Sequence, residues 1–195
     1  DPGSGMAVQS ETAQAVEEAL EAGIFVVAAA GNRDSGEDIL DVSVPANIEG
    51  VIAVGTVTRS GGTWSQSATG STVDPYSQEN RSYPNQKPEV IAPGVLLLST
   101  SGSTIEPPYS YSTGTSDSTV LVTGALALIL QLYGDELRGE DGLIGVDEMD
   151  LVKRTLASSC DKSVIEGAPH DKKGGYGSLD AVQWAADIGF ELNVN

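Results

Sequence analysis

Residues 11–32, ETAQAVEEALEAGIFVVAAAGN, place an amphipathic segment directly before an uninterrupted apolar one. Alanine, valine and leucine recur at helical spacing over residues 11–22, and Gly23 ends the pattern. Residues 24–30, IFVVAAA, follow at once, and such a continuous apolar run is typical of a strand covered on both faces. The stretch therefore predicts a helix followed by a buried strand.

Helix and strand continue to alternate along the chain. Further strands are expected at 50–58 (GVIAVGTVT) and 89–94 (EVIAPG), and further helices at about 116–133, at 146–160 and within 174–189. The polar residues 59–86 predict surface loops with at most one short strand, and another loop runs through Glu106, Pro107 and Pro108. We expect an α/β fold, a three-layer sandwich with a mostly parallel sheet, present here only in part because only three strands are recognisable.

The charge balance is strongly acidic. The chain has 28 Asp and Glu against 10 Lys and Arg, a formal net charge of −18. This charge repels nucleic acid and anionic membranes, so neither is expected as a partner. Because the acidic residues are spread over the chain and concentrated salt screens their repulsion, we predict a haloarchaeal or other halophilic source. An acidic protein of an ordinary mesophile is the alternative.

Chain length and cysteine content indicate what kind of domain the chain can form. The 195 residues are enough for one domain, and the start at Asp1 leads us to expect a segment of a longer chain. Cys160 is the only cysteine, which excludes an internal disulfide and predicts a small, half-buried residue after a helix. No signal peptide is recognisable, and the apolar run Val120–Leu130 is too short to span a bilayer.

Two polar residues stand where secondary-structure elements meet. Ser116, in YSTGTSDSTV, lies at the start of the long apolar helix, where it is either an N-cap or a nucleophile at the positive end of the helix. Asn32 follows the first buried strand, and the carboxyl edge of a parallel sheet is where α/β proteins bind ligands. A turn residue that tolerates left-handed backbone angles is the alternative for Asn32.

The order of four motifs makes a specific resemblance. VVAAAGN, GVIAVGTV, KPEVIAPG and STGTSDSTVLVTGALALIL follow one another, and GGYGSLDAVQWA closes the series. The ordered set resembles the C-terminal half of the catalytic domain in subtilisin-like serine proteases. This resemblance covers nearly the whole chain and implies one subtilisin-like domain whose N-terminal part is absent from residues 1–195.

The resemblance also implies roles for individual residues. Ser116 matches the nucleophile that attacks the scissile carbonyl, and its backbone N–H together with the Asn32 amide would form the oxyanion hole. Arg33 would lie at the rim of the specificity pocket and allow it to tolerate acidic side chains, with a solvent-facing arginine as the alternative. The residues expected to bind substrate are Ala29, Ala30, Gly31, Arg33 and Thr115.

Asp117 is where the sequence departs from the family pattern. The family commonly has an apolar residue after the nucleophile and a proline soon afterwards, whereas this chain continues Asp117, Ser118, Thr119, Val120. On the leaving-group side, Asp117 would alter specificity or raise the pKa of a neighbouring imidazolium. The alternative is an acidic residue that stabilises the first turn of the helix.

A serine nucleophile needs a base, and the chain has one histidine, His170, in a loop that matches no catalytic element. We therefore expect the catalytic Asp and His in an upstream portion, and an inactive isolated chain. A catalytically dead binding or structural module is the alternative. A serine esterase of the α/β-hydrolase class is disfavoured, because no G-x-S-x-G motif surrounds Ser116.

Cofactors, partners and location complete the expectations. No cofactor is expected, apart from a structural calcium ion that the resemblance would assign to the carbonyls of Ala46, Ile48 and Val51 and the carboxylate of Glu89. The expected partners are protein or peptide substrates and the N-terminal portion of the same domain. The resemblance implies an extracellular protein.

Overall fold

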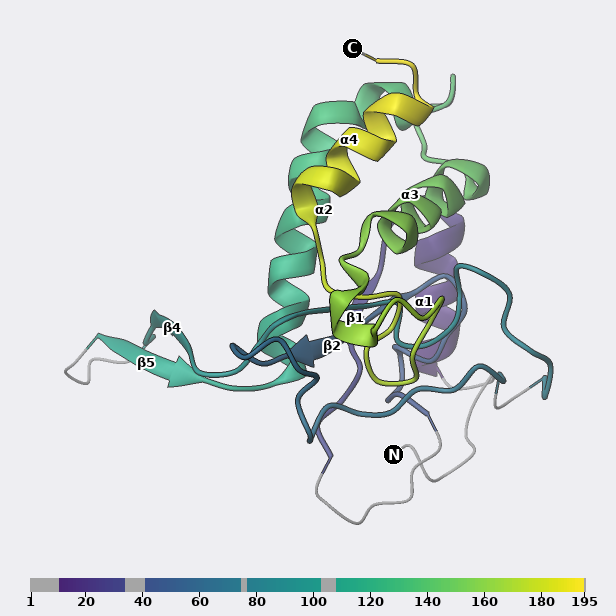
Figure 1. Ribbon diagram of the computed structural model, residues 1–195. Helices are drawn as coiled ribbons and strands as arrows, with labels where there is room; N and C mark the ends of the chain where they lie inside the picture. The colour runs from purple at the N-terminus through teal and green to yellow at the C-terminus, as the bar shows by residue number, and fades with distance from the viewer. Residues whose placement is uncertain (1–10, 34–40, 75–76, 103–107, 195) are drawn as a thin grey trace.

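A computed structural model describes residues 11–33, 41–74, 77–102 and 108–194 (Figure 1). Its sheet has the strand order β1 (Val27–Ala29), β2 (Ile52–Val57), β3 (Val90–Pro93), and both pairs are parallel. The register pairs Val27 with Ile52 and Val54 with Val90. The predicted parallel sheet is confirmed, and β2, its central strand, is buried along its whole length.

Helices cover both faces of the sheet. They are α1 (Glu11–Glu21), α2 (Thr115–Leu137), α3 (Val146–Ser159) and α4 (Ala181–Glu191), with a 3₁₀ turn at Lys162–Ile165. Ile52 and Val54 of β2 pack into a core shared with α2, α3 and α4, whereas Ala53 packs into a second core with α1 and residues 42–51. Successive strand residues point to opposite faces, so one strand serves both cores. The result is the three-layer α/β sandwich that the sequence predicted.

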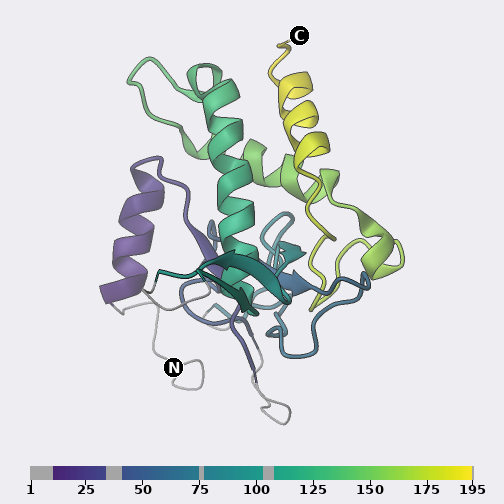
Figure 2. The same cartoon turned by 90° about the vertical axis from the view of Figure 1, so that its left-hand side faces the viewer.

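The long apolar helix is longer than expected. α2 begins one residue before Ser116 and ends at Leu137 rather than near Tyr133, because Gly134 and Leu137 are both buried and continue the core-facing stripe. Its 23 residues, with a mean hydropathy of 1.4, are long and apolar enough to cross a membrane by length and composition alone. This corrects the estimate from Val120–Leu130. α2 nevertheless contacts all three strands, as a core helix does (Figure 2).

The segment after β3 was wrongly predicted as a loop. β4 (Leu97–Thr100) and β5 (Tyr109–Ser112) form an antiparallel hairpin that projects from the body of the molecule (Figure 1). Residues 103–107, which include Glu106 and Pro107 of the expected loop, lie outside the described residues. The hairpin escaped prediction because both strands are short and β5 is exposed throughout, so neither shows a buried pattern.

Two glycines follow strands of the sheet at positions that no other residue could occupy without strain or collision. Gly31 has φ 108°, and a side chain there would collide with the Ser43 hydroxyl. At Gly94, just after β3, a Cβ would meet the Ser118 hydroxyl and would lie 2.7 Å from the carbonyl oxygen of Gly114. Both positions therefore require glycine, one for its backbone angle and one for lack of space.

Trp184 offers a test of the larger core. Its side chain is fully buried between α4 and α3, and its indole N–H donates to the Val152 carbonyl at 3.1 Å. We expect Trp184→Ala to lower the free energy of unfolding by about 3–5 kcal/mol, measured by denaturant titration. Val182→Ala, on the same helix with its side chain 81% exposed, is the control and should change it by less than about 0.5 kcal/mol. Equal effects of the two would contradict this placement of α4.

Candidate active site

The start of α2 decides what Ser116 can do. The N-cap of the helix is Gly114, in an extended conformation, and Thr115 is the first helical residue. Ser116 is therefore the second residue of the helix, and its side chain is exposed. The interpretation of Ser116 as an N-cap is wrong, because a glycine already holds that position. An exposed hydroxyl on the first turn remains free for chemistry.

Buried hydrogen bonds fix the first turn of α2 on the sheet. The Gly114 N–H donates to the carbonyl of Gly94 at 2.9 Å. The buried Ser118 hydroxyl donates to the Ala92 carbonyl at 2.8 Å and lies 2.8 Å from the Thr56 hydroxyl. These contacts join the helix start to the carboxyl ends of β2 and β3. Sequence reasoning missed Ser118, although a hydroxyl inside an apolar helix could have signalled a buried partner.

Thr115 joins the helix start to Asn32. The Thr115 backbone N–H and hydroxyl both donate to Asn32 Oδ1 at 2.9 Å, and the hydroxyl accepts from the Gly31 N–H at 3.2 Å. Because the atom facing two donors must be the amide oxygen, the Asn32 NH₂ group points away from Thr115. Asn32 and Thr115 belong to motifs 83 residues apart in the sequence, and the fold brings the two residues into contact.

Two N–H donors near Ser116 have no protein acceptor within the part of the chain that the structure describes. They are the Asn32 Nδ2 group and the backbone N–H of Ser116. A methyl group built on Gly114 would lie only 3.1 Å from Asn32 Nδ2, so the amide lies beside the turn that leads into Ser116. Free donors at a helix N-terminus are suited to stabilising a developing negative charge.

The other residues expected to bind substrate differ in accessibility. Ala29 and Gly31 are partly exposed, whereas Ala30 is buried. Thr115 is 1% exposed, so its side chain contacts Asn32 and Gly31 instead of an open surface. Arg33 is half-buried and donates from Nη2 to the Asp41 carbonyl at 2.6 Å. Ala29, Gly31 and Arg33 are therefore the partly accessible members of the set.

Asp117 extends the site towards the hairpin. The Ser112 hydroxyl, at the end of β5, donates to Asp117 Oδ2 at 2.9 Å. This oxygen would lie 3.6 Å from a methyl group built on Gly114, on the same turn as Asn32 Nδ2. Asp117 is half-buried and makes no ion pair with the described residues. A carboxylate without a cationic partner therefore stands next to the serine.

His170 lies at the other end of β3. Its Nε2 is 3.0 Å from the Pro88 carbonyl oxygen, and its ring packs edge-on against Tyr176. Burial lowers the pKa of His170, against the hydrogen bond with Pro88, which raises it. Pro88 precedes β3 whereas Gly94, which contacts the α2 start, follows it, so His170 is not brought to Ser116.

Cys160 is a structural residue, as the sequence predicted. The thiol is buried and donates to the Leu156 carbonyl at 3.1 Å. Burial raises the pKa of Cys160 to about 12, which keeps the reactive thiolate form rare.

Glu89, expected as a calcium ligand, contacts two lysines. Its side chain is 1% exposed, and its Oε1 accepts from Lys87 Nζ at 2.8 Å and Lys153 Nζ at 3.0 Å. Burial lowers the pKa of Lys87 to about 8, although the Glu89 carboxylate raises it. Within the described ranges, no group of three or more His, Cys, Asp or Glu side chains could hold a metal ion. The sequence could have identified Lys87 as a partner of Glu89, because residues two apart in an extended segment lie on the same face.

Comparisons with known proteins find subtilisins and other serine proteases among the relatives of this chain. The chain is 38% identical over 120 residues to Subtilisin DY of Bacillus licheniformis, covering 62% of this chain and 37% of the relative. It is 35% identical over 134 residues to Serine protease AprX of Bacillus subtilis (strain 168), covering 63% and 29%. Subtilisin E of the same strain is 40% identical over 119 residues, covering 60% and 26%. The chain thus spans well under half the length of these relatives.

Solved structures share the fold at lower identity. The Prenylagaramide maturation protease PagA matches with a TM-score of 0.63 and 24% identity, over 90% of this chain and 55% of that one. The self-cleaved protease domain of PatA matches with a TM-score of 0.63 and 22% identity, over 98% and 58%. The subtilase family model (Peptidase_S8) matches residues 3–177. The chain therefore belongs to the subtilase family.

Proposed function

We propose that this chain is the C-terminal part of a subtilisin-like catalytic domain and that the complete domain is a serine endopeptidase. The observation that carries the proposal is the contact between Thr115 and Asn32. It supports an arrangement in which the exposed Ser116 hydroxyl, its own N–H and the Asn32 amide act on one carbonyl group.

The proposed reaction is acyl transfer followed by hydrolysis. Ser116 Oγ attacks the scissile carbonyl while a base takes its proton, and the carbonyl oxygen becomes an oxyanion that accepts from Asn32 Nδ2 and the Ser116 N–H. Collapse of the tetrahedral species breaks the C–N bond, and the amine leaves with a proton returned by the base. A water molecule then attacks the carbonyl carbon of the acyl-enzyme while the base takes its proton. The ester C–O bond breaks, and the base returns the proton to Ser116 Oγ. Protein or peptide substrates suit this chemistry.

The base that activates Ser116 has to come from outside the described residues. Exposed apolar surface supports the proposal that an upstream portion of the same domain supplies this base. A groove of about 590 Å³ runs between residues 23–27 and α2. Within the described residues β1 pairs with β2 alone, so its outer edge is free. Apolar side chains of α2 are also 42–66% exposed, namely Val120, Leu121, Leu128 and Leu132. An upstream strand and helix would cover this surface and deliver an Asp–His pair, so the isolated chain should be inactive.

The source and the location of the protein are also part of the proposal. The net charge of −18 supports a halophilic source, in which molar salt screens the acidic surface. We propose an extracellular location because the chain resembles the subtilisins. A catalytically dead module is the second candidate, and the position of His170 away from Ser116 favours it if no upstream base exists.

Asn32 provides the sharpest test of the mechanism. In the full-length protein, we expect Asn32→Asp to lower kcat for a peptide substrate by about 10²–10³ with little change in KM. Aspartate keeps the oxygen that accepts from Thr115 but lacks the amide donor, so the fold is preserved while the oxyanion loses one partner. Ser116→Ala should abolish turnover.

The matched control is Asn80→Ala, an exposed asparagine remote from α2, which should leave kcat unchanged. A kcat of Asn32→Asp equal to that of wild type would contradict the proposed oxyanion hole. Absence of cleavage by folded wild type in molar salt would favour the dead module.

Asp117 is proposed to set specificity on the leaving-group side. Asn32 follows β1, and the hairpin that ends at Ser112 follows β3, so Asn32 and Ser112 reach the helix start from different strands. The Asp117 carboxylate lies on the Ser112 side and lacks a cationic partner among the described residues. A basic residue directly after the scissile bond would supply that partner.

Peptides that differ only at this residue test the assignment. We expect kcat/KM to be about two- to fivefold higher with Lys than with Leu, and Asp117→Asn to remove the difference, since a partly exposed ion pair contributes about 0.2–1 kcal/mol. Asp117→Glu, which keeps the charge, should retain some of it. An unchanged Lys-to-Leu ratio in Asp117→Asn would refute the role of Asp117 without touching the role of Ser116.

A further inference from the structure

Two buried lysines meet at the amino-terminal end of the sheet. Lys87 is 0% exposed and Lys153, from the middle of α3, is 4% exposed. Lys87 Nζ donates to the Val51 carbonyl at 2.6 Å and to Glu89 Oε1 at 2.8 Å. Lys153 Nζ donates to the same two oxygens, at 3.3 and 3.0 Å. Both ammonium groups therefore bind one shared pair of oxygens.

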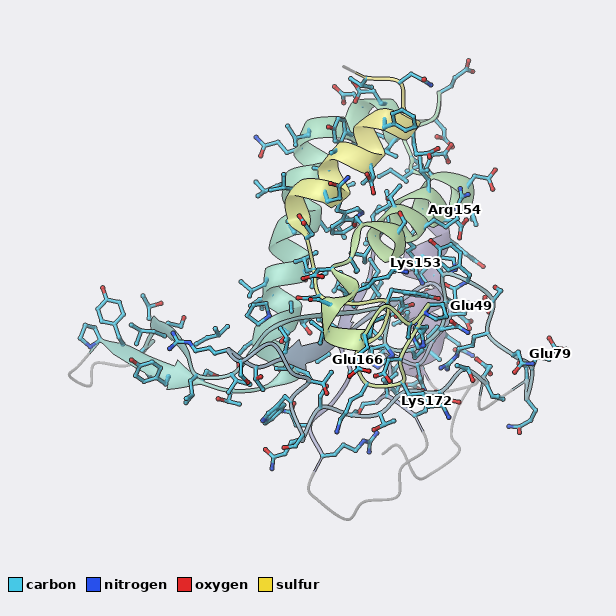
Figure 3. The ribbon with its side chains drawn as sticks, viewed as in Figure 1. Glu49, Glu79, Lys153, Arg154, Glu166 and Lys172 are labelled. Carbon is cyan, nitrogen blue, oxygen red and sulfur yellow. The ribbon has the colours of Figure 1, made fainter. Side chains whose placement is uncertain are left out.

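Neighbouring polar groups are paired with this cluster as well. Lys153 Nζ uses its third hydrogen on Asn85 Oδ1 at 2.5 Å, and Asn85 Nδ2 donates to Glu49 at 3.1 Å. Glu89 Oε2 accepts from the Ala53 N–H at 2.8 Å. Figure 3 labels Lys153 on α3 and Glu49 close to it. A buried carboxylate with every oxygen occupied is a completed site, not an open one.

These contacts do not fit the calcium ion that the resemblance had led us to expect. Calcium binds six to eight oxygens at about 2.3–2.6 Å. Of the four residues assigned to it, Val51 and Glu89 already accept from ammonium groups, and the Ile48 carbonyl accepts from the Val51 N–H at 3.3 Å. A divalent ion here would also be repelled by two nearby positive charges in a buried environment.

We infer that the ammonium groups of Lys87 and Lys153 are built-in cations that take the place of a structural metal ion at Val51 and Glu89. Together they carry the charge of one divalent cation. Because the two ammonium groups are covalently part of the chain, their hydrogen bonds connect β2, β3 and α3 at any calcium concentration. The cluster lies at the amino-terminal ends of the strands, whereas Ser116 lies at their carboxyl ends, so this device stabilises the domain without entering the reaction.

Thermal unfolding of the full-length protein, in chelator and in millimolar calcium, tests the inference. We expect Lys153→Met to lower Tm in chelator by roughly 10 °C, because removing one partner of a buried ion pair leaves the other charge uncompensated. Lys172→Met, an exposed lysine also labelled in Figure 3, is the control and should leave Tm unchanged. Any calcium-dependent rise in Tm should persist in Glu89→Gln. Loss of that rise in Glu89→Gln, or an unchanged Tm in Lys153→Met, would overturn the inference.

Amine acetylation of the wild type gives a readout that needs no variant. Lys87 and Lys153 should stay unmodified in chelator and in calcium, while the exposed Lys172 reacts, as mapped by mass spectrometry. Acetylation of Lys87 or Lys153 that rises when calcium is added would show that a metal ion displaces them, and would contradict the inference even if Glu89→Gln failed to fold.

Discussion

The contact between Thr115 and Asn32 is the constraint on which the active-site geometry depends. It fixes the register of α2 over the carboxyl end of β1, and it turns the Asn32 amide so that its Nδ2 group points away from Thr115 and lies beside Gly114. The Gly114–Gly94 and Ser118–Ala92 hydrogen bonds make the same tie to β3. A helix start held from both outer strands cannot slide or rotate without breaking buried hydrogen bonds, so Ser116 is presented in one position.

The groups that stabilise the domain and the groups proposed to react lie at opposite ends of the sheet. At the amino-terminal ends of β2 and β3, buried charges on Lys87, Glu89 and Lys153 join the strands to α3. At the carboxyl ends, hydrogen bonds of the buried residues Thr115 and Ser118 hold the start of α2, while Ser116 and Asn32 are exposed and, among the described residues, the Asn32 Nδ2 group and the Ser116 N–H have no protein acceptor. Open α/β sheets bind ligands at the carboxyl ends of their strands. Exposed polar groups with unpaired donors at the carboxyl end, and a buried, paired cluster at the amino-terminal end, are consistent with this rule.

The sequence predicted the elements whose burial pattern is strong and missed those whose partners lie far away. IFVVAAA and GVIAVGTV predict buried strands because their residues are almost all apolar; β2 is buried along its whole length, whereas β1 is confined to Val27–Ala29 and only its middle residue is buried. The exposed β4–β5 hairpin has no such pattern and was missed. In the site, Ser116 and Asn32 were predicted from their positions at element ends. Lys153 could not be connected with Glu89, because 64 residues separate them and only the packing of α3 brings them together.

The proposed mechanism requires Ser116 to be an activated nucleophile in the complete domain. The most direct measurement is treatment of the full-length protein, in molar salt, with a fluorophosphonate, followed by mapping of the adduct by mass spectrometry. A covalent adduct on Ser116, absent from Ser116→Ala, is the predicted result, since a serine reacts only when a base removes its proton. A folded protein that forms no adduct would contradict the account and leave Ser116 as an exposed residue in the first turn of α2.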